Sequence, residues 1–473
     1  MPLPTGLLSD AMAIWHAGLA AVRSDRLVRD ALRVEGSTLV VGEDDFPLSS
    51  IRRILVVGAG KAGAGMASAV EEVLGPRVAA EKQLAGWVNV PADCVRPLPH
   101  IHLHAARPAG VNEPTPAGAA GAAEILRRLA TLGRDDLCLC LLSGGGSALL
   151  PAPVEAITLE DKLAVTQFLS AAGANIEQLN TVRKQLSRIK GGGLARACGA
   201  GRLLSLIISD VPGDPLDLIA SGPTVEDRST PADALASLRQ FAAHESDIPA
   251  AVLRWLTTRR AGGVSLRAAN AEADASGSPG CRVTNLVIGN NATAVDAAGM
   301  EAERRGYSHA MISAREPEGP AEEVGRHLAA MARQMRDGAP ACGSGPDCLI
   351  SGGEPVVRLV EPSRRGRGGR NQQLALAALE TFWDDGGRDV AFLSGGTDGE
   401  DGPTDAAGAF FDAGIMQAAR DLGLAPQEFL ARNDAYHFFE PLGALLKTGP
   451  THTNVCDLRV VVTRTSPRPL GEG

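Results

Sequence analysis

Aromatic residues and excess positive charge are both scarce in this chain. Phe, Trp and Tyr make up 3% of the 473 residues, so we expect a core built mainly from Ala, Leu and Val. The 46 Lys and Arg are outnumbered by 55 Asp and Glu, which leaves a net charge of −9. This balance argues against broad nucleic-acid binding, and no nucleic-acid partner is expected.

Paired cysteines and long apolar runs are also missing. None of the eight cysteines forms a C-x-x-C pair, and Cys138 and Cys140 stand in the apolar run 137–142. We therefore expect buried, reduced thiols and a cytoplasmic location. No apolar run reaches transmembrane length and the first residues lack a signal-peptide layout, so no membrane partner is expected. Residues 466–473 are predicted to be a disordered tail.

What is present is the composition of a globular protein with two or three domains. Apolar runs alternate with helical patterns, which is typical of a parallel sheet with helical crossovers. The sequence predicts an α/β fold with an N-terminal Rossmann-like domain, a parallel sheet flanked by helices, over 1–240. A second α/β domain is predicted over 241–465, with a glycine-rich loop or linker at 261–282.

The periodicity predicts the individual elements. Helices are expected at 9–34, 62–74, 116–132, 159–172, 175–198, 291–305, 320–336, 370–383, 405–421 and 435–447. Strands are expected at 54–57, 84–90, 101–105, 136–142, 203–209, 283–289, 308–313, 347–351, 356–360, 389–394 and 457–463.

A glycine loop follows the first of these strands and carries the main candidate site. Gly58, Gly60 and Gly63 fit G-x-G-x-x-G, which suggests a dinucleotide site. A dinucleotide site needs an acidic residue at the end of the next strand, where it binds the ribose. That residue is missing here, because the first acidic residue, Asp93, comes too late in the chain. Lys61 stands inside the loop, where it would meet an anion at a helix N-terminus. Anion binding, dinucleotide binding and plain helix–strand packing remain open.

A second glycine loop follows the strand at 136–142. Ser143, Gly144, Gly145, Gly146 and Ser147 can form a nest whose N–H groups converge on one oxyanion. The alternative is an ordinary tight turn. Ser147 is not predicted to be a hydrolase nucleophile, because G-x-S-x-G is not satisfied and no His follows in triad order.

Basic residues gather at two further places. Arg183 and Lys190 belong to a positive stripe over 180–193, which predicts either phosphate binding or a solvated helix face. Arg370 ends a glycine-rich basic loop and enters a helix, where it can clamp a transferring phosphoryl group. The alternative is a basic surface loop. RNA binding is disfavoured because no aromatic residues interleave with the arginines.

Carboxylates follow two predicted strands on glycine turns. Asp210 lies in 209–214 and Asp398 in 397–405. Hard oxygen ligands of this kind suit Mg²⁺, which accepts one or two carboxylates together with substrate phosphates. Turn and helix-cap chemistry explains the same pattern equally well.

Taken together and in this order, these segments resemble the class II glycerate 2-kinases, which combine a glycerate-kinase domain with a C-terminal MOFRL domain. The matching stretches are VVGAGKAG, LLSGGGSALLPAP, LNTVRKQLSRIKGGGLA, ISDVPGDPLDLIASGPT, LISGGEP, GRGGRNQQLALA, LSGGTDGEDGPTDAAGA and TGPTHTNVCDL. The resemblance covers residues 54–460. One departure is Arg107, which stands where the family's Gly-His-Pro histidine is expected.

The resemblance implies ATP-dependent, Mg²⁺-assisted phosphorylation of D-glycerate at its 2-hydroxyl, in a cleft between the two domains. It implies essential roles for Lys61, on the phosphoryl group or the glycerate carboxylate, and for Arg370, on the transition-state charge. Asp210, Glu354 or Asp398 would hold Mg²⁺ or draw the hydroxyl proton; we predict Asp210 as catalytic and Glu354 and Asp398 as metal ligands. A homo-oligomer is compatible with the sequence, which does not determine it.

Two other functions remain open at this point. One is an NAD(P)H-dependent hydroxypyruvate reductase, a label that some proteins of this family have carried. The other is a sugar-acid-binding sensor without turnover. The missing ribose carboxylate counts against the reductase.

Overall fold

The computed structural model describes residues 6–108, 110–111, 113–261, 280–338 and 345–464. The predicted tail at 466–473 and most of the predicted linker at 261–282 lie outside these residues. The chain forms two compact units: Ser24–Ile288, and Gly289–Gly473 together with Met1–Arg23. The predicted division at 240/241 differs from this one, and the N-terminal helix belongs to the C-terminal unit.

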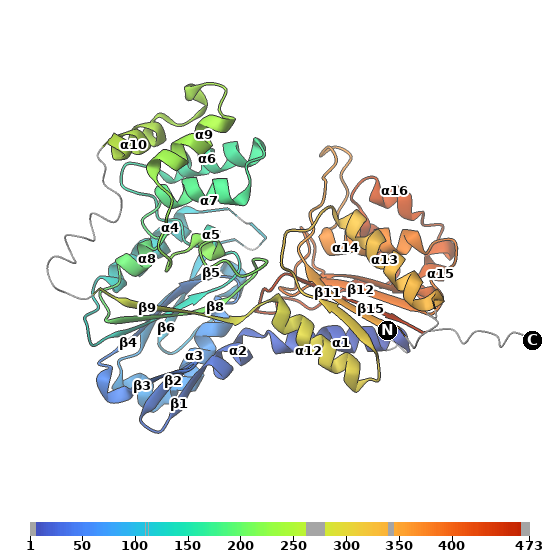
Figure 1. The fold of residues 1–473 in the computed structure, drawn as a ribbon, viewed down its shortest axis with the longest axis horizontal. Coiled ribbons are helices and arrows are strands. Elements are labelled where there is room, and N and C mark those ends of the chain that lie inside the picture. Colours follow the sequence, from blue (N-terminus) through green and yellow to red (C-terminus); the bar gives the residue numbers. More distant parts are fainter. Residues whose placement is uncertain (1–5, 109, 112, 262–279, 339–344, 465–473) are drawn as a thin grey trace, which may run out of the picture. The chain divides into compact units, whose positions relative to one another are not determined.

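The unit Ser24–Ile288 is built on a six-stranded sheet (Figure 1). Its strands, in order across the sheet, are β6 (Ile101–Arg107), β5 (Ala85–Pro91), β4 (Ile54–Ala59), β7 (Leu137–Leu142), β8 (Arg202–Ile208) and β9 (Arg282–Gly289). The pairings from β6 to β8 are all parallel. Every residue of β4 and β7 is buried, as continuous apolar runs in a sheet covered on both faces predict. The strand predicted at 283–289 is β9, and it belongs to this sheet because it lies next to β8; the prediction had placed it in the second domain.

Helices cover both faces of this sheet. One face carries α2 (Ser24–Ala31) and α3 (Gly63–Glu81), and the other carries α4 (Pro116–Leu129), α5 (Gly146–Leu149) and α8 (Gly193–Arg196) (Figure 1). A separate helical layer comprises α6 (Leu159–Ala171), α7 (Ile176–Gln185), α9 (Pro231–Phe241) and α10 (Ala250–Ala261). This layer has its own apolar cluster, with Val165, Val182 and Leu235 buried inside it.

The unit also contains a small antiparallel sheet that the sequence analysis did not predict. It comprises β1 (Leu32–Glu35), β2 (Thr38–Val41) and β3 (Asp44–Pro47). The helix expected at 9–34 is consequently wrong as a single element, because it divides into α1 (Leu7–Ala21), α2 and β1. Short 3₁₀ turns complete the unit at Leu48–Ser50, Ala92–Cys94, Ile219–Ser221 and Glu245–Asp247.

The second unit is built on a mixed six-stranded sheet. Its order is β10 (His309–Ile312), β11 (Cys348–Gly353), β15 (Asp457–Thr463), β12 (Val390–Gly396), β13 (Gly408–Asp412) and β14 (Leu445–Leu446). α1 and α12 (Asn291–Arg304) cover one face, and α13 (Ala321–Asp337) and α14 (Arg370–Thr381) the other (Figure 1). The remaining helices are α15 (Ala413–Asp421), α16 (Pro426–Leu430) and α17 (Ala435–Phe439). The first helix joins this unit because the Trp15 indole is buried and donates to the Leu458 carbonyl at 3.0 Å.

Four further predicted elements differ from the structure. The helix expected at 175–198 ends at Gln185, and Gly191 and Gly192 adopt positive φ before α8. The helix at 405–421 is β13 followed by α15, with Asp412 as its N-cap. The helix at 435–447 shortens to α17 before β14. The strand at 356–360 is reduced to a single bridge between Val356 and Pro320.

The described residues contain seven cysteines, none of them in a disulfide. Cys138 and Cys140 are buried, as predicted. In the same residues, every helix is too short or too polar to span a bilayer.

Candidate active site

Three predicted segments meet at one edge of the sheet in the unit Ser24–Ile288. β4, β7 and β8 are adjacent and parallel, so their carboxyl ends lie side by side. Gly60 and Lys61 follow β4, Ser143–Ser147 follows β7, and the half-buried Asp210 follows β8. This edge is where open α/β sheets bind ligands.

The two glycine loops are locked together by hydrogen bonds. The Lys61 amide donates to the Gly144 carbonyl at 2.9 Å. The Ala62 amide donates to the Ser143 hydroxyl at 3.0 Å, and the Ser143 amide donates to the Ala59 carbonyl at 3.2 Å. The backbone position of Lys61 is therefore fixed by the loop that the sequence predicts to be an oxyanion nest.

Gly60 shows why this junction needs glycine. Its φ is +149°, and a Cβ there would lie 1.9 Å from the Ser143 hydroxyl oxygen. Gly60→Ala is therefore expected to lower the unfolding free energy by about 2–4 kcal/mol, from backbone strain and the clash together. Urea denaturation measures this.

Gly36→Ala is the matched control for Gly60→Ala. Gly36 also has a positive φ, +61°, but its Cβ would meet nothing within 4 Å. The control should cost about 1 kcal/mol, the conformational penalty alone. Equal losses in the two variants would contradict the packing argument.

Lys61 and Arg107 both approach the nest at Gly145. A Cβ on Gly145, whose φ is +77°, would lie 3.3 Å from an Arg107 guanidinium nitrogen and 3.6 Å from Cγ of Lys61. Arg107 itself is buried at the end of β6. The residue that departs from the family's expected histidine thus brings a second cation, besides Lys61, to the nest.

Lys190 and Ser147 are in direct contact on the other side of the nest. The Lys190 ammonium lies 2.6 Å from the Ser147 hydroxyl and 2.9 Å from the Ser147 carbonyl oxygen. Ser221 joins them, with its hydroxyl 2.9 Å from that of Ser147 and donating to Asn180 Oδ1 at 3.0 Å. Ser221 has a φ of +63°, a strained value for a residue with a side chain, and such strain concentrates at functional sites.

Arg183 and a residue not singled out from the sequence, Lys162, complete this group of cations. Lys162 on α6 is 4% exposed, and its Nζ is without a hydrogen-bond partner within the described part of the chain. Burial, together with the smaller effect of the Arg183 charge, lowers the pKa of Lys162 to about 7. Burial, with Lys162 and Arg183, also holds the pKa of Lys190 well below its usual range.

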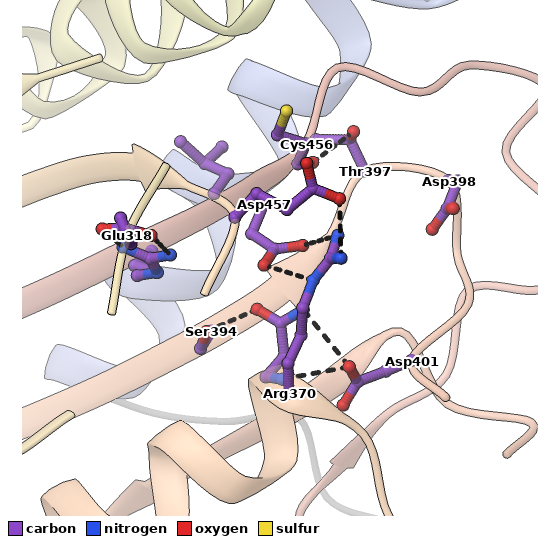
Figure 2. Close-up of polar contacts among 12 residues, drawn as sticks. Glu318, Arg370, Ser394, Thr397, Asp398, Asp401, Cys456 and Asp457 are labelled. Atoms are coloured by element: carbon purple, nitrogen blue, oxygen red, sulfur yellow. Dashed lines mark hydrogen bonds and ion pairs between the residues drawn. The ribbon is translucent and has the colours of Figure 1, made fainter. Parts of the chain in front are cut away.

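The second unit presents Arg370 at the first turn of α14. Its Nε and Nη2 donate to the two Asp457 carboxylate oxygens at 2.8 and 3.0 Å, and its Nη1 donates to Glu354 at 2.8 Å (Figure 2). Asp457 is fully buried, so this bidentate pair fixes the plane of the guanidinium. Together, Asp457 and Glu354 hold the pKa of Arg370 above its usual value despite burial.

Asp401 holds the start of the same helix. Its carboxylate accepts from the Asn371 and Gln372 amides at 3.0 and 2.8 Å. Burial raises the pKa of Asp401 to about 7, although these two amides oppose the shift. The carboxylate therefore anchors the helix N-terminus that positions Arg370 (Figure 2).

Of the two predicted metal ligands, Glu354 accepts a hydrogen bond from Arg370, and Asp398 is near enough to act electrostatically on Glu354. Burial raises the pKa of Glu354, and the negative charges of Asp457 and Asp398 raise it further. Asp398 accepts from the Glu400 amide at 3.0 Å on the loop after β12. No cluster of three His, Cys, Asp or Glu suited to a metal occurs among the described residues. One or two carboxylates are nevertheless what Mg²⁺ needs when a nucleotide supplies its other oxygens, so the donor set fits.

Sequence reasoning missed Asp457, Asp401, Lys162 and Ser221. Asp457 opens a predicted apolar strand, and its charge inside that run was the available signal. Asp401 lies in the acidic stretch 397–405 already noted. Lys162 and Ser221 carried no signal, because their roles come from contacts between distant segments.

Two protein-family models and several curated proteins match this chain. A family model described as a domain of unknown function, DUF4147, matches residues 10–257, and the MOFRL family model matches residues 347–457. A glycerate kinase of Danio rerio is 37% identical, covering 98% of this chain and 99% of that protein. A D-glycerate 2-kinase of Thermotoga maritima is 33% identical, covering 96% of this chain and 98% of that protein.

One solved structure and one further relative are also similar to this chain. The crystal structure of a glycerate kinase from Thermotoga maritima superposes with a TM-score of 0.77 at 32% identity, covering 98% of this chain and all of that one. A protein of Agrobacterium vitis called a putative hydroxypyruvate reductase is 37% identical, covering 92% of this chain and 93% of that protein.

Proposed function

Because this chain belongs to the class II glycerate 2-kinase family, with its DUF4147 and MOFRL regions, we propose that it phosphorylates D-glycerate at the 2-hydroxyl, with ATP as donor. The observation that carries the proposal is that each unit fixes one cation-bearing element by itself: Asp457 and Glu354 hold the Arg370 guanidinium, and Gly144 and Ser143 hold the backbone of the Lys61 loop. Phosphoryl transfer needs positioned positive charge more than covalent chemistry, and both groups are held by backbone or buried carboxylates.

Each residue has a distinct task in this proposal. Arg370 neutralises charge that develops on the transferring phosphoryl group. Lys61 holds either that group or the glycerate carboxylate, and Asp210 draws the proton from the attacking hydroxyl. Gly60 and Ser143–Ser147 keep Lys61 in place and present the nest to an oxyanion.

Glu354 and Asp398 would hold Mg²⁺. The ion supplies charge neutralisation between nucleotide phosphates when bound. Since Glu354 also accepts from Arg370, its carboxylate would couple the arginine to the metal site. We propose a cytoplasmic location as well, which fits the cysteines that the described residues leave outside disulfides.

The experiment pairs two assays on the purified protein. One contains D-glycerate, ATP and Mg²⁺ and follows ADP release; the other contains hydroxypyruvate and NADH and follows the loss of 340 nm absorbance. We expect glycerate-dependent ADP release and no NADH oxidation. NADH oxidation without ADP release would overturn the proposal in favour of the reductase, and binding without turnover in either assay would favour a sensor.

A further inference from the structure

Three buried or half-buried cations in the unit Ser24–Ile288 lack an acidic partner. Lys162 is 4% exposed and Lys190 is 2% exposed, and Arg183 lies on the adjacent helix α7. Among the described residues, none of the three forms an ion pair within 4 Å, and Lys162 Nζ forms no hydrogen bond. Lys190 donates only to neutral oxygens, those of Ser147, Ala220 and Ser221.

Three other buried cations among the described residues are paired with carboxylates. Lys82 lies 2.7 Å from a Glu81 carboxylate oxygen, and Lys184 lies 3.2 Å from Asp217. Arg459, 1% exposed, lies 2.6 Å from Glu318. A buried charge without a partner costs several kcal/mol, and proteins avoid it by pairing. The group Lys162–Arg183–Lys190 lacks the acidic partner that Lys82, Lys184 and Arg459 have.

Lys190 connects this group of cations to the nest and to two serine hydroxyls. Lys190 touches Ser147, the last residue of the nest, and Ser221 contacts both. The cations also act on one another, since Arg183 lowers the pKa of Lys162 and both lower that of Lys190. In the ligand-free state, burial and mutual repulsion therefore disfavour the charged forms of the two lysines, and a bound anion would favour them.

We propose that Lys162, Arg183 and Lys190, with the Ser147 and Ser221 hydroxyls, form a binding site for an oxyanion, a phosphoryl or carboxylate group of a reactant. Lys162 is the lysine of the group whose ammonium has no hydrogen-bond partner among the described residues. The site adds to the proposed function and rests on it only for the identity of the reactant that supplies the oxyanion. Oxyanion chemistry fits because every side chain in the group is a cation or a hydroxyl, and neither a cation nor an apolar group would offset three positive charges.

A neighbouring cavity of about 740 Å³ has the opposite charge character to the group of cations. It runs along α7 and past Asn180, and its charged lining is mainly acidic. Those charged residues are Glu177, Lys184, Asp217, Glu226, Asp227 and Arg228. An anionic group is repelled by that lining and is attracted by the cations on the other side of Ser221.

Lys162→Met tests the site, because methionine keeps the length of the side chain and removes its charge. The ligand-free variant is expected to melt a few degrees higher than the wild-type protein, since an uncompensated buried cation is gone. Its affinity for inorganic phosphate is expected to fall at least tenfold. D-Glycerate and Mg²⁺-free ATP, titrated separately, identify which reactant supplies the oxyanion.

Proton uptake is the readout that a purely structural role would not move. An oxyanion favours the charged lysine, so binding near pH 8 should take up protons from the buffer in the wild-type protein. Calorimetry of phosphate binding in two buffers of different ionisation enthalpy measures this uptake, which should fall in Lys162→Met. The pKa of Lys162 is about 7 in the folded protein against 10.5 without burial, so wild-type stability should also rise more than the variant's between pH 7 and 10.

Lys82→Met is the matched control, because Lys82 is equally buried but paired with Glu81. It should lower or preserve the melting temperature and leave phosphate binding and proton uptake unchanged. Equal affinity of Lys162→Met and wild-type protein for phosphate, glycerate and ATP, with equal proton uptake, would overturn the proposal. A protein that binds phosphate with proton uptake but never phosphorylates glycerate would overturn the proposed function alone.

Discussion

Arg370→Lys is expected to lower kcat for glycerate phosphorylation by about 10²–10³-fold with a much smaller change in KM. Lysine keeps a positive charge beside the buried Asp457, so the protein should still fold. It cannot donate two parallel hydrogen bonds to Asp457 and a third to Glu354, as Arg370 does. The charge then loses its fixed direction toward the phosphoryl group. Steady-state kinetics at saturating ATP measures the effect.

Arg326→Lys is the control for this arginine substitution. Arg326 belongs to the same unit and pairs with Glu380 at 2.9 Å on the surface. Its replacement should leave kcat within twofold of the wild-type value, because a surface ion pair contributes little. An Arg370→Lys enzyme with full kcat would show that the guanidinium fork has no catalytic role.

Lys61→Met is expected to lower kcat/KM for glycerate by about 10²–10³-fold while circular dichroism shows an unchanged fold. The loop should persist because it is held by backbone bonds of Lys61 and Ala62 to Gly144 and Ser143, which methionine preserves. The kinetic split assigns the role of the amine. A loss mainly in kcat places Lys61 on the phosphoryl group, and a loss mainly in glycerate KM places it on the carboxylate.

Lys82→Met controls for the loss of a lysine from the same unit and should retain wild-type kinetics, since Lys82 pairs with Glu81. Retention of full kcat/KM by Lys61→Met would contradict the site.

The parts of the fold that the sequence predicted correctly are those that local patterns determine. The strands predicted at 54–57 and 136–142 are continuous apolar runs followed by glycine loops, and the structure has them as β4 (Ile54–Ala59) and β7 (Leu137–Leu142). The helices at 116–129 and 159–171 begin at the N-cap residues Thr115 and Thr158. The hydroxyl of each threonine accepts a hydrogen bond from a backbone amide in the first turn of its helix.

The wrong elements are those where tertiary contacts override local preference. The alanine-rich stretch 405–412 reads as helix, but 408–412 pairs with β12 and with β14. The helix predicted at 175–198 ends at Gln185 because Ser187 forms a bridge with Pro153, and Gly191 and Gly192, at φ +54° and +77°, then turn the chain toward Ser221 and Gly222. No local pattern shows these pairings.

The candidate site divides in the same way. Glycine loops and an arginine at a helix start are visible as spacing, so the sequence predicted Lys61, the nest and Arg370. The groups that orient them come from far away along the chain: Asp457 lies 87 residues after Arg370, and Ser221 lies 74 after Ser147. Lys162 stands out only once burial and the absence of an acid among its described neighbours are known.

The central claim, phosphorylation of glycerate at its 2-hydroxyl, is tested most directly by the identity of the product. Proton-coupled ³¹P NMR of the purified protein incubated with D-glycerate, ATP and Mg²⁺ locates the new phosphate. The account predicts a product resonance split into a doublet by the single proton on C2, together with an equal amount of ADP. A triplet, from coupling to the two protons of C3, or no organic phosphate other than the nucleotides, would contradict it.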